Sequence, residues 1–174
     1  MTTNFSWLPP MVLNPGNWNT YLEILYRYFT DDFIHSQPKF DNKRVALKRQ
    51  PVINGKEATF WHFISEKSPD SSLEEDRIPN FRRCERIRWV KPVMEQYGEQ
   101  NTIRWWKTTR PSNRGTVHRI ILALADFSYV VIVDERKEYV LPWTQFPVEH
   151  AKQREKLKRE HNEYWGTQKA GDTI

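Results

Sequence analysis

The chain has 174 residues with eight Trp and one Cys, and it carries a net charge of +5 at pH 7. This length suits one domain, 1–174, with its own hydrophobic core, and the single Cys84 excludes an internal disulfide and favours a reducing compartment. No apolar stretch is long enough to span a bilayer, and the first residues lack the basic start and apolar run of a secretory signal. We therefore expect a cytoplasmic protein without membrane contact.

The N-terminal region, 1–36, is expected to form one amphipathic helix. Asn17 suits an N-cap because it directly precedes an apolar pattern with three- and four-residue spacing. The members of this pattern are Trp18, Tyr21, Leu22, Leu25, Tyr28, Phe29 and Phe33. The pattern predicts a helix to about residue 35 whose apolar stripe packs into the core.

The next region, 37–79, contains four Pro and is predicted to be irregular. Within it, 44–49 is compatible with a short strand, and 57–65 is compatible with either a strand or a helix. The acidic run 68–76 is expected to be an exposed loop.

The third region, 80–165, is predicted to form a helix, a sheet and a second helix. A helical pattern runs from residue 80 to about 96, and Pro92 should break it near residue 91. Four strands are expected at 103–108, 117–125, 129–133 and 139–144. A surface helix should follow from Pro147 to Trp165, and the tail 166–174 is expected to fray. Helices and strands segregate along the chain, which indicates an α+β fold with N-terminal helices on a small four-stranded, mainly antiparallel sheet.

Residues 126–128 are predicted to connect two adjacent antiparallel strands. The second of these, from Tyr129, is apolar on both faces and should lie centrally in the sheet.

Positive charge is concentrated in one part of the chain. Between Arg77 and Arg119 there are eleven Lys/Arg and three Glu, a local charge of +8, so the remainder sums to −3. A concentrated basic surface beside a sheet points to a polyanion, RNA or alternatively DNA. The residues expected to bind nucleic acid are Arg83, Arg86, Arg104, Trp106 and Arg110. A solvated charged face, with Trp106 packed in the core, is the alternative interpretation.

The sequence offers few groups for metal chemistry and more for metal-independent RNA cleavage. The five histidines form no close-spaced pair, so neither a metal nor another cofactor is expected. Metal-independent cleavage needs an acid, a base and cations around one phosphate. His62, between two aromatic residues, is the candidate acid or base, and a structural histidine is the alternative. Arg119 is expected to be either paired and partly buried or directed into a cleft.

Three segments carry a resemblance to a known superfamily. They are a basic helix at 83–92, the segment Asp126–Ile132, which leads into an apolar strand, and the stretch Leu141–Phe146 followed by a charged helix. Residues 80–165 thereby resemble the phage- and toxin-associated nucleases of the barnase–EndoU–colicin–RelE-like superfamily, which cleave RNA without a metal on a small antiparallel sheet. In those proteins the last strand often ends in a hydroxyl residue, a small residue and an aromatic residue. Here Thr144 and Phe146 fit, whereas Gln145 replaces the small residue.

The resemblance implies a role for several side chains. Thr144 would contact a phosphate, Arg104, Lys107 and Arg119 would stabilise charge, and His62 would transfer protons. A toxin of this kind would have an antitoxin or immunity protein as its partner. The first hypothesis is therefore a metal-independent endoribonuclease of toxin or phage-defence type, with His62, Arg119, Thr144 and Lys107 as its catalytic set. A non-catalytic RNA- or DNA-binding protein using residues 77–119, and a protein-interaction module of phage origin, are the alternatives.

Overall fold

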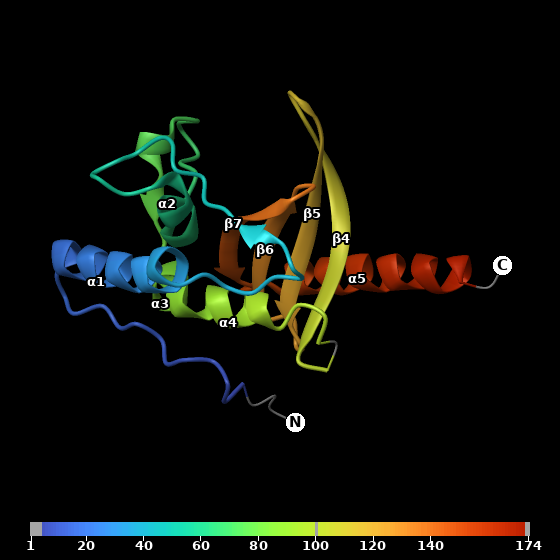
Figure 1. Ribbon diagram of the computed structural model, residues 1–174. Helices are drawn as coiled ribbons and strands as arrows, with labels where there is room; N and C mark the ends of the chain where they lie inside the picture. The colour runs from blue at the N-terminus through green and yellow to red at the C-terminus, as the bar shows by residue number, and fades with distance from the viewer. Residues whose placement is uncertain (1–4, 100, 173–174) are drawn as a thin grey trace.

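The computed structural model describes residues 5–99 and 101–172 and has an α+β fold built around one main sheet (Figure 1). The strand order in this five-stranded sheet is β1-β7-β6-β5-β4. Its strands are β1 (Arg44–Val45), β4 (Ile103–Ser112), β5 (Gly115–Leu124), β6 (Tyr129–Glu135) and β7 (Tyr139–Pro147). The last four are successive antiparallel neighbours, as predicted, but β1 pairs with β7 in parallel. The expectation of a four-stranded sheet was therefore wrong by this one short strand.

Five α-helices surround the sheet, with short elements between them. The helices are α1 (Trp18–Thr30), α2 (Ala58–Ile64), α3 (Phe81–Glu85), α4 (Val90–Glu95) and α5 (Ala151–Gly171). The shorter elements are the π-helical turn η1 (Asp31–His35), the 3₁₀ turns η2 (Glu74–Asp76) and η3 (Ile87–Trp89), and the two-stranded pair β2 (Ser65–Glu66) and β3 (Ile78–Pro79). Within the described ranges, no helix combines the length and apolar character needed to cross a membrane.

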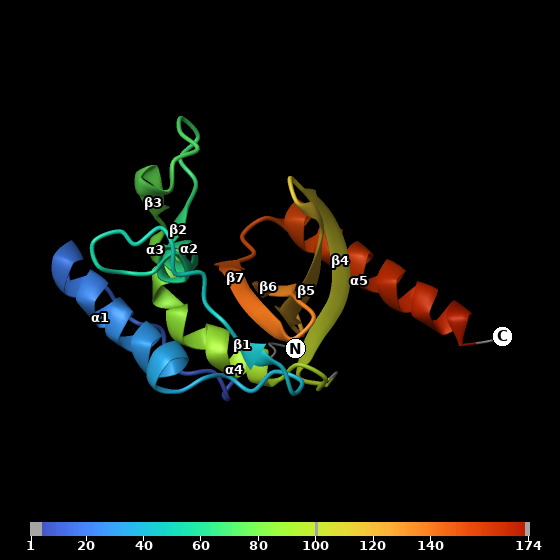
Figure 2. The same ribbon diagram turned by 45° about the horizontal axis from the view of Figure 1, so that its top comes forward.

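The sheet separates two hydrophobic cores, with α1–α4 on one side and α5 on the other (Figure 2). Alternation along the strands produces this division, because successive side chains point to opposite faces. On β6, Tyr129, Val131 and Val133 join the larger core, whereas Val130 lies in the smaller core under α5. The prediction that this strand is central and covered on both faces is confirmed. The turn at 126–128 also connects β5 to β6, as predicted.

The helix predictions were partly confirmed. Asn17 caps α1 by accepting a hydrogen bond from the Thr20 backbone N–H, and η1 extends the helical segment to His35. Within the ambiguous stretch 57–65, Ala58–Ile64 form the helix α2 and Ser65 begins β2. Pro92 does not break the third segment, because it lies in the first turn of α4, where its missing N–H costs no hydrogen bond. The break lies at Arg86 instead.

The boundaries of the last helix differ from those expected. Pro147 ends β7, and α5 begins at Ala151 and continues through Gly166 to Gly171. Leu157 is the buried residue that anchors α5 on the sheet, consistent with a thin apolar stripe.

The face of the sheet that α5 covers becomes polar along its length. Next to Leu157 this face is apolar, whereas further along it presents Arg119 on β5, Asp134 on β6 and Thr144 on β7. At the same place the β6–β7 register shifts, so that Trp143 is an extra residue opposite the Ile132/Val133 pair. Such a bulge redirects a side chain, and it places the Trp143 ring against α2. The polar part of this face and the bulge therefore lie next to each other on β7, at Thr144 and Trp143.

Candidate functional site

The C-terminal end of α2 is held by two side chains of β7 and by the backbone at the start of α3. A short helix leaves its last carbonyl groups without intrahelical partners. Here the His62 carbonyl accepts from Thr144 Oγ1 (3.4 Å), the Phe63 carbonyl from Gln145 Nε2 (2.6 Å) and the Ile64 carbonyl from the Asn80 N–H (2.8 Å). These bonds fix α2 against β7 and α3, and therefore fix His62 beside Thr144.

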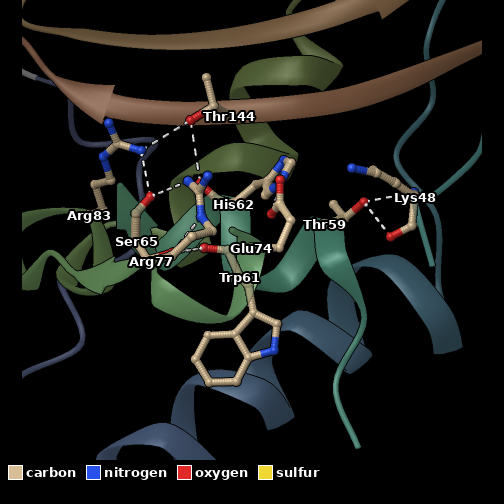
Figure 3. A network of polar contacts seen from close by, with 9 residues as sticks. All are labelled: Lys48, Thr59, Trp61, His62, Ser65, Glu74, Arg77, Arg83 and Thr144. Atoms are coloured by element: carbon tan, nitrogen blue, oxygen red, sulfur yellow. Dashed lines mark hydrogen bonds and ion pairs between the residues drawn. The ribbon is translucent and has the colours of Figure 1, made fainter. Parts of the chain in front are cut away.

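Two arginines complete this end of the helix (Figure 3). Arg77 Nη2 and Arg83 Nη1 each donate to the Ser65 carbonyl at 2.8 Å, and Arg83 Nη1 also donates to Thr144 Oγ1 at 3.2 Å. The negative pole of a helix C-terminus favours such cations. Burial lowers the pKa of both guanidinium groups from the ordinary value, but an arginine remains charged at neutral pH. The result is two fixed positive charges in one place.

His62 forms a pair with Glu74 of η2. The distance from Nε2 to the Glu74 carboxylate is 2.8 Å, and the His62 side chain is 5% exposed against 27% for Glu74. Burial lowers the pKa of His62, and the charges of Arg77 and Lys48 lower it further against the opposing effect of Glu74. Partial burial opposes ionisation of Glu74, but the His62 bond, Lys48 and Arg77 outweigh it and lower its pKa. At pH 7 a neutral imidazole therefore donates from Nε2 to a charged carboxylate, which leaves the lone pair on Nδ1.

The Trp143 ring contacts His62 and two further cations. Its ring contacts the His62 ring edge-on, with 5.0 Å between centroids. Lys48 Nζ lies 5.3 Å from the Trp143 centroid and Arg119 Cζ lies 5.7 Å from it. Arg119 also pairs with the buried Asp134 at 2.9 Å. Arg119 is thus paired and partly buried, which was the first of the two alternatives considered from the sequence, and its guanidinium lies against the Trp143 ring.

These groups line one cleft with a volume of about 280 Å³. Its lining residues are Lys48, His62, Glu66, Lys67, Glu74, Arg77, Arg83, Arg110, Trp143 and Thr144. Five Lys/Arg against two Glu give the lining a net charge of +3 with a neutral histidine. Close-up, the side chains of Arg77, Arg83 and Thr144 converge beside Ser65 (Figure 3). An anionic group of phosphate size suits a cleft of this charge and composition.

The structure brings several of the expected site residues together. His62, Thr144, Arg83 and Arg110 line the cleft, and Arg119 contacts the Trp143 ring. Of the expected catalytic set, His62 and Thr144 thus line the cleft, Arg119 contacts it only through Trp143, and Lys107 lies elsewhere. His62 is also more deeply buried than a solvent-facing base.

Four other residues that were expected in the site lie outside the cleft. Trp106 is fully buried beneath α5, where its ring meets His161 and Phe127, so it cannot stack on a base. Lys107 pairs with Glu135 outside the cleft. The Arg86 guanidinium donates to the Arg82 carbonyl and pairs with Glu85, and its side chain is 12% exposed, so it is a structural group rather than an open binding residue. Arg104 lies in a separate groove between β4 and α5.

Four groups in the site were not predicted as site residues. Glu74 belongs to the acidic run that was expected to be an exposed loop, but it lies in the 3₁₀ turn η2 and its carboxylate pairs with His62. Arg77 was counted only as part of the local charge, and Lys48 lies outside the basic region at 77–119. Trp143 was not among the expected site residues, and the bulge that redirects it leaves no pattern in the sequence.

Comparison with known proteins adds nothing to this geometry. No family model matches the chain, and neither curated proteins nor solved structures give a match. Among the residues that the structure describes, no group of three or more His, Cys, Asp or Glu side chains is arranged to hold a metal ion.

Proposed function

We propose that this protein is a metal-independent endoribonuclease of toxin or phage-defence type, and that the cleft between α2 and β7 is its active site. The observation that supports this most directly is the meeting of the His62–Glu74 pair, the Thr144 hydroxyl and a cluster of cations in one cleft. These groups come from α2, η2 and β7, which are separate segments of the sequence. The resemblance of residues 80–165 to metal-independent ribonucleases points to the same chemistry.

In this proposal His62 is the general base. RNA cleavage of this type begins when a base removes the proton of the 2′-hydroxyl, whose oxygen attacks the adjacent phosphorus. A neutral imidazole can accept that proton at Nδ1, while Glu74 orients the ring through Nε2 and stabilises the imidazolium that forms. The low pKa of His62 keeps it in the basic form at neutral pH.

The cations act on the phosphate. Arg77 and Arg83 are held by the Ser65 carbonyl before any substrate arrives, so they can stabilise the dianionic transition state without reorganising. Thr144 offers its hydroxyl to a phosphate oxygen. Lys48 lies over Trp143 and lines the same cleft as His62. In this proposal it is the general acid that protonates the leaving 5′-oxygen. The predicted products are a 2′,3′-cyclic phosphate and a free 5′-hydroxyl.

The test compares purified wild-type protein with H62Q on a labelled RNA, with and without EDTA. We expect EDTA-resistant cleavage by the wild type, no cleavage when the scissile nucleotide is 2′-deoxy, and a loss of about 10²–10⁴-fold in H62Q, the range for removing a general base. H150Q is the matched control, because His150 is exposed and lies outside the cleft. Cleavage by H62Q at the wild-type rate would exclude the assignment of His62.

A second candidate function, binding of RNA or DNA without cleavage, is favoured by one observation. The His62 side chain is only 5% exposed, which is appropriate for a structural partner of Glu74. Retained binding by a wild-type protein that cleaves no RNA would select this alternative.

A further inference from the structure

A second cationic depression adjoins the cleft. It has a volume of about 480 Å³ and is lined by Phe33, Ile34, Gln37, 44–49, Tyr139 and Leu141. Lys48 lines both this depression and the cleft. The two therefore meet at the Lys48 side chain, and a ligand that fills the cleft can continue past Lys48.

Parallel pairing places two similar pairs of side chains along this path. Arg44 is opposite Tyr139 in the β1–β7 register, and the Arg44 guanidinium lies 5.6 Å from the Tyr139 ring centroid. Four residues further along both segments, Lys48 Nζ lies 5.3 Å from the Trp143 centroid. At about 3.4 Å per residue, the two aromatic positions are roughly 13 Å apart along β7. A cation over an aromatic ring thus occurs twice, once in the cleft and once beyond it.

The wall that carries these cations is fixed before a ligand binds. The Lys48 and Arg49 carbonyls accept hydrogen bonds from the first N–H groups of α2, at Thr59 and Ala58, and the Lys48 N–H donates to Thr59 Oγ1. The same helix that carries His62 therefore positions Lys48. The cleft and the second depression share one support.

Charge gives this path a direction. The depression beyond Lys48 is lined by Arg44, Lys48 and Arg49 with no acidic residue, a net charge of +3. A different depression adjoins the cleft through Arg83 and Glu66 and is also lined by Glu149, a net charge of −1. A polyanion leaving the cleft is attracted to the first and repelled by the second.

We infer that the depression at Arg44 and Tyr139 is a second nucleotide subsite, which binds a flanking nucleotide of a single-stranded RNA whose scissile phosphate lies in the cleft. This inference rests on the proposed function. The Tyr139 ring, or the plane of the Arg44 guanidinium, supplies a stacking surface for a base, and Arg44 and Arg49 contact phosphates. Stacking tolerates any base, so the subsite selects for length and single-strandedness rather than sequence.

The experiment uses DNA oligonucleotides with one ribonucleotide at the cleavage position, extended by one nucleotide at a time on the 5′ or the 3′ side. At a stacked spacing of about 3.4 Å per nucleotide, up to about four nucleotides span 13 Å. We expect kcat/KM to rise about tenfold on one side only, once the extension reaches the subsite. All-deoxy oligonucleotides of the same lengths should show the same step in Kd.

The double variant R44Q/Y139L should lose this step while cleaving the shortest substrate at the wild-type rate. R159Q, which removes one exposed charge from α5, should keep it. If the double variant does not fold, R44Q alone decides the question, because the Arg44 side chain is exposed. A step of equal size in the variant, or no step on either side, overturns the second subsite. A wild type that shows the step in binding but cleaves no oligonucleotide overturns the ribonuclease and leaves the subsite in place.

Discussion

Gln145 is the side chain on which the position of α2 depends most directly, and replacing it with Met tests that dependence. Its Nε2 group donates to the Phe63 carbonyl at 2.6 Å and to the Arg83 carbonyl at 2.8 Å, and the residue is fully buried. Methionine has a similar length and no donor. Gln145→Met therefore removes both hydrogen bonds with little change in packing.

The two carbonyls are not equally affected. The Phe63 carbonyl lies in the last turn of α2 and loses its partner, which costs about 1–3 kcal/mol. The Arg83 carbonyl still accepts from the Arg86 N–H, so only a net hydrogen bond of about 1 kcal/mol is lost there. Removing Gln145 Oε1, a buried oxygen without a partner among the described residues, returns about 1 kcal/mol. The expected loss of folding stability is about 2 kcal/mol.

Urea denaturation followed by Trp fluorescence measures this loss directly. For a chain of this size, about 2 kcal/mol corresponds to a decrease in Tm of roughly 4–8 °C. Gln153→Met on α5 makes the same chemical change outside the core, and it should stay within about 0.5 kcal/mol of the wild type. If Gln145→Met were as stable as Gln153→Met, the Gln145 bonds would not hold α2, and the argument for a fixed His62 would fail.

Three further outcomes are expected. In Glu74→Gln the carboxylate no longer favours the imidazolium, so the pKa of His62 falls further and the acidic limb of the pH–rate profile moves to lower pH; an unchanged limb would contradict the pairing. Tyr129→Phe should leave the unfolding free energy unchanged or raise it by up to about 1 kcal/mol, because the buried Tyr129 hydroxyl has no partner among the described residues; a large loss in urea denaturation would reveal a missed hydrogen bond. RNA binding measured by fluorescence anisotropy should weaken with salt at a log–log slope of about −2 if the cleft and its neighbour neutralise three phosphates, and a flat response would remove the polyanion proposal.

Local patterns were sufficient to predict most of the secondary structure. The three- and four-residue spacing from Trp18 and the cap at Asn17 reflect contacts within α1 itself, and the alternating strands reflect burial on both faces of the sheet. β1 was not predicted as part of the sheet, because only two of its residues pair, in parallel, with a strand about ninety residues away. The stretch 57–65 stayed ambiguous, because almost all of α2 is buried and its sequence therefore has no amphipathic period.

The site was harder to predict than the fold. His62 and Thr144 were chosen for their chemistry, and they do lie together. Trp106 was chosen for the same reason, but it is buried in the core under α5. The sequence alternation along a strand does not show whether a helix covers the face on which a Trp lies. Glu74 could not be recognised, since its role depends on the loop folding back onto α2.

The stability of the fold and the charge of the cleft have one common cause. The chain ends a short helix, α2, at a place where its exposed carbonyl groups need donors, and it supplies Arg77 and Arg83 there. Each guanidinium group has five N–H donors in a fixed fork, and the hydrogen bonds of Arg77 and Arg83 to Ser65 and Thr144 use only part of them. The remaining donors belong to the same immobilised groups that line the cleft. A phosphate that binds there meets charges whose side-chain entropy was already lost on folding. Of the two arginines, Arg77 also lowers the pKa of His62, in addition to burial, and the pKa of Glu74. The capping of one helix therefore accounts for both the rigidity of the site and its electrostatic character.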